Sequence, residues 1–161
     1  MQTSIRPENF RKSELPARIT SSSEEETHAL GEQLAALLEK GSIVALKGHL
    51  GAGKTCLVKG IARGLGIEET LRSPSYTVVF EYETGNYGEK TPVYHIDAYR
   101  LEGNEDFSAI GGKDMVFGNG ISLIEWSDHI PSFIPAEALR VDIEIAGDDE
   151  RRFHIYYGNT T

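Results

Sequence analysis

The sequence predicts an α/β fold, in which helices flank a sheet and antiparallel strands are added at one edge. An apolar run, Ile43–Leu46, is followed by a glycine-rich stretch and a helical segment, Cys56–Gly64, so strand, loop and helix come in direct succession. Two more apolar runs, at 93–96 and 121–124, predict further buried strands. Over residues 141–145, apolar side chains alternate with acidic ones, which is typical of a half-exposed strand.

The chain has 161 residues and a formal net charge of −9. This length predicts one domain, to which we assign residues 18–161, and residues 1–17 are predicted to form an N-terminal extension or a loose edge strand. The acidic balance disfavours unaided binding to nucleic acid, whose phosphates attract a basic face. Cys56 is the only cysteine, which predicts a cytoplasmic location, and no apolar run predicts a signal peptide or a membrane span.

The first predicted helix begins at a capping box. Ser23 is its N-cap, and Glu26 is the residue whose carboxylate reaches back to the helix start. Apolar side chains then recur at helical spacing up to Gly41, which predicts the end of the helix. These side chains are Leu30, Leu34, Leu37 and Leu38.

The second half of the chain is predicted to form short strands and one short helix, separated by turns. Residues 76–82 are rich in β-branched and aromatic side chains and predict a strand that ends in a turn at Gly85-Asn86. Residues 104–110 predict a short helix, which two glycines close. A turn at 147–149 leads into a last strand over 152–157.

Residues 48–55 fit the pattern G-x-x-x-x-G-K-S/T at every fixed position. They are Gly48, His49, Leu50, Gly51, Ala52, Gly53, Lys54 and Thr55. In such a loop the backbone N–H groups enclose a phosphate, the lysine reaches the outer phosphates of ATP, and the hydroxyl binds Mg²⁺. The helix that begins near Cys56 directs its positive end at the same anion. The sheet is therefore expected to be P-loop NTPase-like; a chance match in a turn is the alternative.

A P-loop needs a second acidic group for the Mg²⁺ shell, and the carboxyl ends of neighbouring strands supply such groups. Asp97 follows one apolar run, and Glu125 follows a more uniformly apolar one. We predict that Thr55 and Glu125 hold the metal and that Asp97 positions water or lies in an outer shell. The predicted catalytic residues are thus Lys54, Asp97 and Glu125. Each carboxylate has the alternative role of capping a loop.

Three nearby segments have two interpretations each. His95 lies two residues before Asp97 and either orients a phosphate or that carboxylate, or is a core histidine. Arg100 is either an internal arginine finger or an ion-pair partner that holds its loop. Residues 73–76, Ser-Pro-Ser-Tyr, either sense the γ-phosphate or form an ordinary turn.

Two further side chains are also ambiguous. Trp126, next to Glu125, is either an anchor for a partner protein or part of the core. Cys56 is either a thiol with a lowered pKa at a helix N-terminus or, as we favour, a small buried residue beside the phosphates.

In this order, the segments resemble the TsaE (YjeE) family of bacterial P-loop ATPases from about Ile19 to the last strand. The resemblance rests on the P-loop and on residues 20–27, 73–76, 95–100 and 125–128. The run His-x-Asp-x-Tyr-Arg, followed by a strand ending in Glu-Trp, makes it specific. His49 departs from the pattern, because the family usually has Asp there.

The resemblance implies a role in the biosynthesis of threonylcarbamoyladenosine at position 37 of tRNAs that read ANN codons. It implies that ATP is hydrolysed weakly by the protein alone, that the TsaB–TsaD pair is its partner, and that turnover resets TsaD between cycles. The tRNA would be contacted only through these partners. Carried over by residue, Lys54 and Thr55 are P-loop ligands, Glu125 is linked to the metal, Asp97 is needed for hydrolysis, and the segment around Ser23 and Glu24 lies near the base of the nucleotide.

Two other functions remain open from the residues alone. A small nucleotide or nucleoside kinase needs several arginines to clamp two phosphorylated ligands. Only Arg63, Arg72 and Arg100 lie between the P-loop and residue 130, which counts against this function. A nucleotide-dependent adaptor would bind ATP without hydrolysing it. A GTPase is set aside, because no Asn-Lys-x-Asp element is present.

Overall fold

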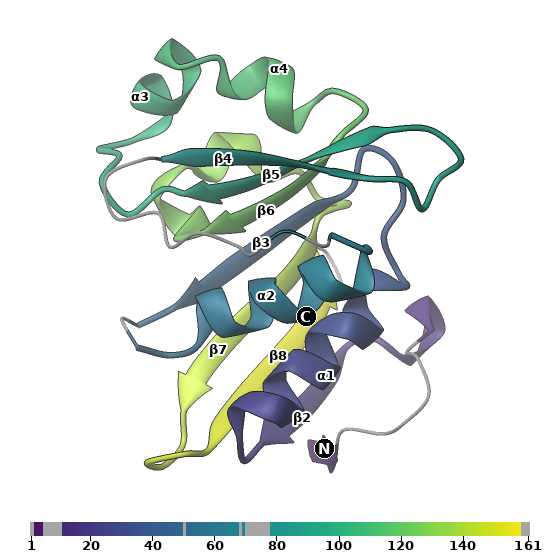
Figure 1. The fold of residues 1–161 in the computed structure, drawn as a ribbon. Coiled ribbons are helices and arrows are strands. Elements are labelled where there is room, and N and C mark those ends of the chain that lie inside the picture. The colour runs from purple at the N-terminus through teal and green to yellow at the C-terminus, as the bar shows by residue number, and fades with distance from the viewer. Residues whose placement is uncertain (1, 5–10, 50, 68, 70–77, 159–161) are drawn as a thin grey trace.

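The computed structural model describes residues 2–4, 11–49, 51–67, 69 and 78–158. One sheet of eight strands crosses the molecule in the order β1-β2-β8-β7-β3-β6-β5-β4 (Figure 1). The strands are β1 (Gln2–Ser4), β2 (Ala17–Ser21), β3 (Ile43–Gly48), β4 (Val79–Thr84), β5 (Thr91–Asp97), β6 (Ile121–Glu125), β7 (Leu139–Ile145) and β8 (Arg151–Tyr157). The predicted α/β class is confirmed.

The parallel strands form the middle of the sheet, and antiparallel strands lie on both sides of them. β3 pairs in parallel with β6 and β7, and β5 pairs in parallel with β6. β4 runs antiparallel to β5, while β8 runs antiparallel to both β7 and β2. The prediction that antiparallel strands are added at one edge was therefore wrong. The β4–β5 turn is too short for a crossover, so these two strands must pair antiparallel.

The helices are α1 (Glu24–Ala35), α2 (Lys54–Gly64), α3 (Asn104–Ala109) and α4 (Gly112–Val116), with 3₁₀ turns η1 (Lys12–Glu14), η2 (Ser127–His129) and η3 (Pro131–Phe133). α4 was not predicted, because Gly111 and Gly112 were taken as the end of a single helix. Gly111 has a φ of +87°, which ends α3 and lets α4 start at once in a new direction.

α1 begins at the predicted cap. The Ser23 hydroxyl accepts a hydrogen bond from the Glu26 N–H at 3.1 Å. The Glu26 carboxylate reaches back to the N–H of Ser22, one residue before the position that a standard capping box uses. The helix ends at Ala35 rather than near Gly41, because the next N–H groups bond three residues back and tighten the chain into turns.

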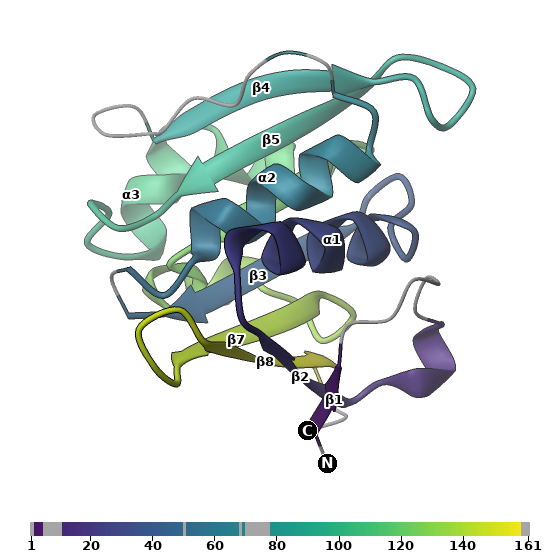
Figure 2. The same cartoon turned by 60° about the horizontal axis from the view of Figure 1, so that its bottom comes forward.

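The sheet separates two apolar clusters. Along β3 and β6, Leu46 and Leu123 belong to the cluster beneath α1 and α2, while Ile43 and Ile124 belong to the cluster that contains Phe107 of α3. Figure 2 shows α1 and α2 side by side across one face of the sheet. The parallel strands are thus buried on both faces, as their apolar sequences predict.

α1 and α2 touch through their backbones. A Cβ atom on Gly31 would lie 2.6 Å from the Ile61 N and the Leu57 O, and one on Gly60 would lie 2.4 Å from the His28 O. These distances leave no room for any side chain at either glycine. The two helices therefore form one closely packed layer.

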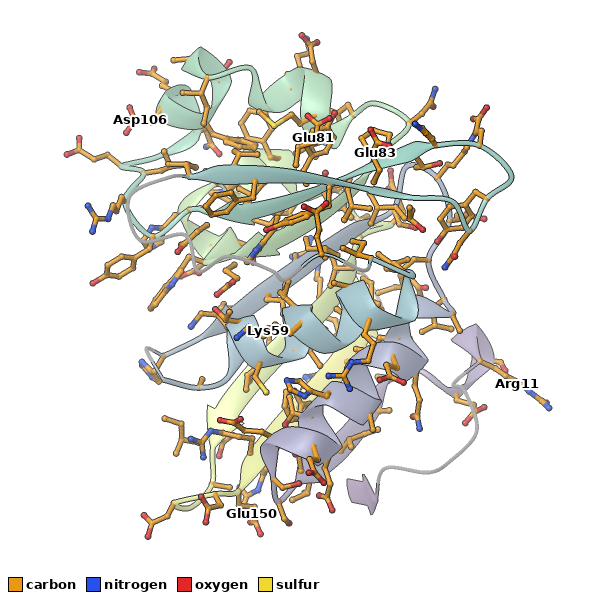
Figure 3. All side chains as sticks on the ribbon, viewed as in Figure 1. Arg11, Lys59, Glu81, Glu83, Asp106 and Glu150 are labelled. Carbon is orange, nitrogen blue, oxygen red and sulfur yellow. The ribbon has the colours of Figure 1, made fainter. Side chains whose placement is uncertain are left out.

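Two edges complete the sheet. At one edge, β1, which lies in the predicted N-terminal extension, pairs with β2. The division between extension and domain at residue 17 stays a prediction. At the other edge, β4 presents the exposed acids Glu81 and Glu83, which Figure 3 shows on the outside of the strand. Such charges discourage pairing with another chain. None of the helices in the described ranges has both the length and the hydrophobicity that a membrane span requires.

Candidate nucleotide and metal site

The P-loop connects the end of β3 to the start of α2. Gly51 and Gly53 have φ values of +80° and +105°, in the left-handed region that favours glycine. Gly48 is required for a different reason, because a Cβ there would lie 2.8 Å from the Ile143 O. Leu50 lies outside the described residues. The backbone geometry explains why glycine occupies the fixed positions of the motif.

The Lys54 ammonium lies over the loop. Its Nζ atom donates to the carbonyl oxygens of Gly48 and His49 at 2.6 and 3.0 Å. It also lies 4.0 Å from the centroid of the Trp126 ring. Trp126 has a φ of +59°, which is unusual for a non-glycine residue and directs the chain sharply after β6. The lysine is thus held between the loop and an aromatic ring.

The electrostatic surroundings of Lys54 are mixed. Burial lowers the pKa of the ammonium, and the carboxylates of Glu125, Asp97 and Asp128 act in the opposite direction. Asp128 was not predicted as a site residue, although it belongs to the 125–128 segment. Its position three residues after Glu125 was the only available signal.

Thr55 and Glu125 meet although 70 positions separate them. The Thr55 hydroxyl lies 2.9 Å from Glu125 Oε1 and 3.0 Å from Oε2. Glu125 ends β6 beside Leu46 of β3, so the strand register brings the acid to the start of α2. Both predicted metal ligands therefore lie together in a largely buried pair of side chains.

His95 contacts Glu125 rather than Asp97. Its Nε2 atom lies 2.6 Å from Glu125 Oε2, and its side chain is fully buried. It is thus buried as the core interpretation expected, but it is paired with a carboxylate other than the one considered, because residues two apart on a strand point in the same direction without facing each other. Reaching the neighbouring strand brings the imidazole to Glu125 instead.

Asp97 lies opposite Glu125 in the β5–β6 register. Its Oδ1 atom accepts a hydrogen bond from the Tyr99 N–H at 2.9 Å. Burial raises the pKa of the Asp97 carboxyl, and the hydrogen bond from Tyr99 partly offsets this. Asp97 therefore makes the loop-capping contact that was considered as an alternative role. It also lies beside Glu125, one of the two predicted metal ligands.

The N-terminus of α1 lies beside that of α2. The Cys56 Sγ atom is 3.8 Å from the Glu24 carbonyl oxygen, so Ser23 and Glu24 stand near the P-loop helix. Cys56 is half-buried, and burial together with Glu24 raises the pKa of its thiol. The alternative of a lowered thiol pKa was therefore wrong.

The other candidates fall into three groups. Trp126 is half-buried and packs against Tyr99, with ring centroids 4.8 Å apart, so it is neither fully core nor fully exposed. Arg100 is exposed on the loop after β5. Residues 73–76 lie outside the described residues.

A contact from Arg151 was missed altogether: its Nη2 atom lies 3.4 Å from the Gly51 carbonyl oxygen, a pairing across 100 positions that no local pattern indicates.

The donor set suits Mg²⁺. Thr55 and Glu125 supply only oxygen atoms, which this hard cation prefers. Among the described residues, no group of three or more His, Cys, Asp or Glu side chains is placed to hold a metal ion. Mg²⁺ usually keeps several waters and is bound by one or two protein groups together with substrate phosphates, so a hydroxyl and one carboxylate are a sufficient protein contribution.

Known proteins are similar to this chain over most of its length. The family model described as "Threonylcarbamoyl adenosine biosynthesis protein TsaE" matches residues 21–153, which include the P-loop, Asp97 and Glu125. The chain belongs to the TsaE family. Membership assigns it to threonylcarbamoyladenosine biosynthesis, as the resemblance in the sequence implied.

Individual TsaE proteins agree over most of their length. The TsaE protein of Treponema pallidum is 40% identical over 138 residues, which cover 86% of this chain and 98% of that protein. TsaE of Bacillus subtilis is 41% identical over 127 residues, or 79% of this chain and 77% of its own. The crystal structure of Bacillus subtilis YdiB superposes with a TM-score of 0.73 at 34% identity, covering 88% of this chain and 85% of that one.

Proposed function

We propose that this chain is the ATP-binding and ATP-hydrolysing component of tRNA threonylcarbamoyladenosine biosynthesis, and that it acts with TsaB and TsaD in the cytoplasm. ATP and Mg²⁺ are its proposed ligands. The observation that carries the proposal is the contact between Thr55 of the P-loop and Glu125 of the neighbouring strand. Two oxygen ligands at the positive end of a helix are the combination that a magnesium–triphosphate complex requires.

Different residues of the site would bind the phosphates of ATP and the Mg²⁺ ion. Backbone N–H groups of the P-loop and the Lys54 ammonium would bind the β- and γ-phosphates. Thr55 and Glu125 would hold Mg²⁺, which neutralises phosphate charge and fixes the orientation of the γ-phosphate. Lys54 donates to the Gly48 and His49 carbonyls, so it has to exchange these bonds for phosphate oxygens when ATP binds.

Asp97 is the proposed group for water. Its carboxylate lies next to Glu125 in the register, and burial raises its pKa, which makes the carboxylate a stronger base. In hydrolysis the water oxygen forms a bond to the γ-phosphorus while the bond to the bridging oxygen breaks. The electron pair remains on ADP, and Asp97 accepts the proton of the attacking water. The products are ADP and inorganic phosphate.

Weak turnover by the protein alone is consistent with the arrangement of arginines. An arginine that stabilises the transferred phosphoryl group accelerates hydrolysis strongly in many P-loop proteins. Arg63 donates instead to Glu32 at 3.2 Å, between α2 and α1, and Arg100 is exposed. Arg151, which lies beside the P-loop, donates to the carbonyl oxygen of Gly51. We therefore propose that TsaB and TsaD stimulate the reaction. Because the chain has a net charge of −9 and tRNA is an anion, we propose that it contacts tRNA only through these partners.

The test is phosphate release from ATP, measured with Mg²⁺, for the protein alone and with TsaB and TsaD. Lys54→Ala should abolish ATP binding and phosphate release, whereas Lys59→Ala, a lysine exposed on the same helix (Figure 3), should behave like the wild type. Phosphate release that needs no Lys54 would contradict the site. A phosphorylated small molecule would indicate the kinase, and ATP binding without any phosphate release would indicate the adaptor.

The role in the pathway requires a cellular test. Depletion of the protein should lower the threonylcarbamoyladenosine content of tRNA, measured by nucleoside analysis, and the wild-type gene should restore it while the Lys54→Ala gene should not. A pull-down with both baits should recover TsaB and TsaD. Full restoration by Lys54→Ala would separate the pathway role from ATP hydrolysis.

A further inference from the structure

We propose that His95 is a positioning residue for Glu125: its imidazole N–H holds Oε2 and leaves Oε1 of the same carboxylate for Mg²⁺. This inference rests on the proposed function, because it needs Glu125 to be a metal ligand. It is carried by the 2.6 Å contact between His95 Nε2 and Glu125 Oε2 in the interior of the sheet.

The surroundings of His95 leave its ring few polar partners. Its register neighbours are Phe80 on β4 and Leu123 on β6, and the side chain is fully buried. A buried polar group is unfavourable unless it forms a hydrogen bond. Leucine or valine would fill such a position in a structural strand, so the contact with Glu125 is what distinguishes this residue from a core side chain.

The contacts on Glu125 are unequal. The Thr55 hydroxyl is shared almost evenly between Oε1 and Oε2, at 2.9 and 3.0 Å, and therefore does not select one oxygen. His95 approaches Oε2 alone. The imidazole thus fixes the rotation of the carboxylate about its last bond, which the threonine does not.

The direction of the hydrogen bond follows from the partners. An ionised carboxylate only accepts, so Nε2 carries the hydrogen and donates it. The other ring nitrogen, Nδ1, is buried and has no hydrogen-bond partner among the described residues. A proton on Nδ1 would be a buried donor without an acceptor, which is more costly than an unpaired lone pair. The Nε2–H tautomer is therefore the one that the structure requires.

A residue that forms a hydrogen bond to a metal ligand influences how tightly the metal is bound. Removing a hydrogen-bond partner of a metal ligand typically lowers metal affinity or activity by about 10- to 100-fold. We expect His95→Leu to raise the Mg²⁺ concentration needed for half-maximal tightening of ATP binding by about this factor. Affinity for ATP in the presence of a chelator should not change, because the P-loop and Lys54 are not touched.

The conservative variant separates positioning from packing. His95→Gln carries an amide N–H at about the reach of Nε2 and should restore the Mg²⁺ dependence to within about threefold of the wild type. Ser122→Ala is the matched control: it removes a fully buried hydroxyl on β6 whose oxygen has no hydrogen-bond partner in the described part of the chain, and it should leave the Mg²⁺ dependence unchanged. Calorimetric titrations of ATP at several Mg²⁺ concentrations provide the readout.

A second measurement does not depend on nucleotide or metal. In ¹⁵N-histidine NMR spectra of the wild-type protein, the His95 signals should show hydrogen on Nε2 and none on Nδ1, and Glu125→Ala should alter them. A Nδ1–H tautomer, equal Mg²⁺ dependence of His95→Leu and the wild type, or equal losses in His95→Leu and His95→Gln would each overturn the inference. Wild-type ATP binding that does not respond to Mg²⁺ would refute the metal role of Glu125 itself, whatever the NMR spectra show.

Discussion

The Lys54 ammonium lies 4.0 Å from the centre of the Trp126 ring. Trp126 is the only tryptophan in the chain, so its fluorescence reports this one place. When ATP binds, Lys54 should turn from the ring and the loop carbonyls toward the phosphates. Addition of magnesium and ATP should therefore change the emission of the wild-type protein and of Lys59→Ala, and leave that of Lys54→Ala unaltered. An equal change in Lys54→Ala would mean that the lysine does not mediate the signal.

Glu125→Ala should separate ATP binding from ATP hydrolysis. The P-loop and Lys54 remain, so part of the nucleotide affinity should persist. Loss of a metal-linked carboxylate should lower Mg²⁺-dependent phosphate release by about 100-fold or more. Steady-state phosphate release and calorimetric binding on the same preparation check both halves. An unchanged rate would transfer the metal role to Asp97.

Asp97→Asn should make the fold more stable and the enzyme inactive. The raised pKa of Asp97 means that the native protein holds its proton more tightly than the unfolded chain, so the ionised acid lowers stability at neutral pH. Asparagine removes this penalty and keeps an oxygen for the Tyr99 N–H. Denaturant unfolding should show a stability gain at pH 7 that shrinks as the pH falls through the pKa of Asp97. A variant less stable than the wild type at pH 7 would contradict the argument.

Gly60→Ala and Gly31→Ala should each destabilise the fold. The added methyl group would meet backbone atoms of the facing helix at 2.4 to 2.9 Å, so the helices must separate. Overpacking of this kind costs about 1–3 kcal/mol. The free energy of unfolding, measured with urea, is the readout. Gly85→Ala is the control, because a Cβ there meets no non-neighbouring atom of the described residues within 4 Å; an equal loss in the control would disprove the packing explanation.

Local patterns predicted much of this structure. The N-cap at Ser23, the strand into the P-loop and the helix after it depend on neighbours within a few residues, and all three are present. The strand predicted over 76–82 appears as β4, which runs on to Thr84; residues 76 and 77 lie outside the described residues. The end of α1 was predicted too late, because the leucines after Ala35 are buried in turns as well as they would be in a helix.

Contacts between strands were harder to predict. The more uniformly apolar run before Glu125 favoured it over Asp97 as the partner of Thr55, and the contact agrees. The contacts of the other side chains depend on the register of β5, β6 and β3, which the sequence did not indicate. For the same reason the pairing of His95 with Glu125 was not among the roles considered for it, and Arg151 was not considered. Pairings of this kind arise from tertiary packing and leave no trace in local periodicity.

The position of β8 has a consequence for the order in which the molecule is completed. β8 lies between β2 and β7, and on its other side β2 pairs with the three-residue strand β1. During synthesis, Ile19 and the rest of β2 leave the ribosome long before the strand that fills the space beside them. The first half of the chain must therefore wait, with one flank unpaired, until the last strand is made, and this is the interval in which the nascent protein most needs protection from aggregation.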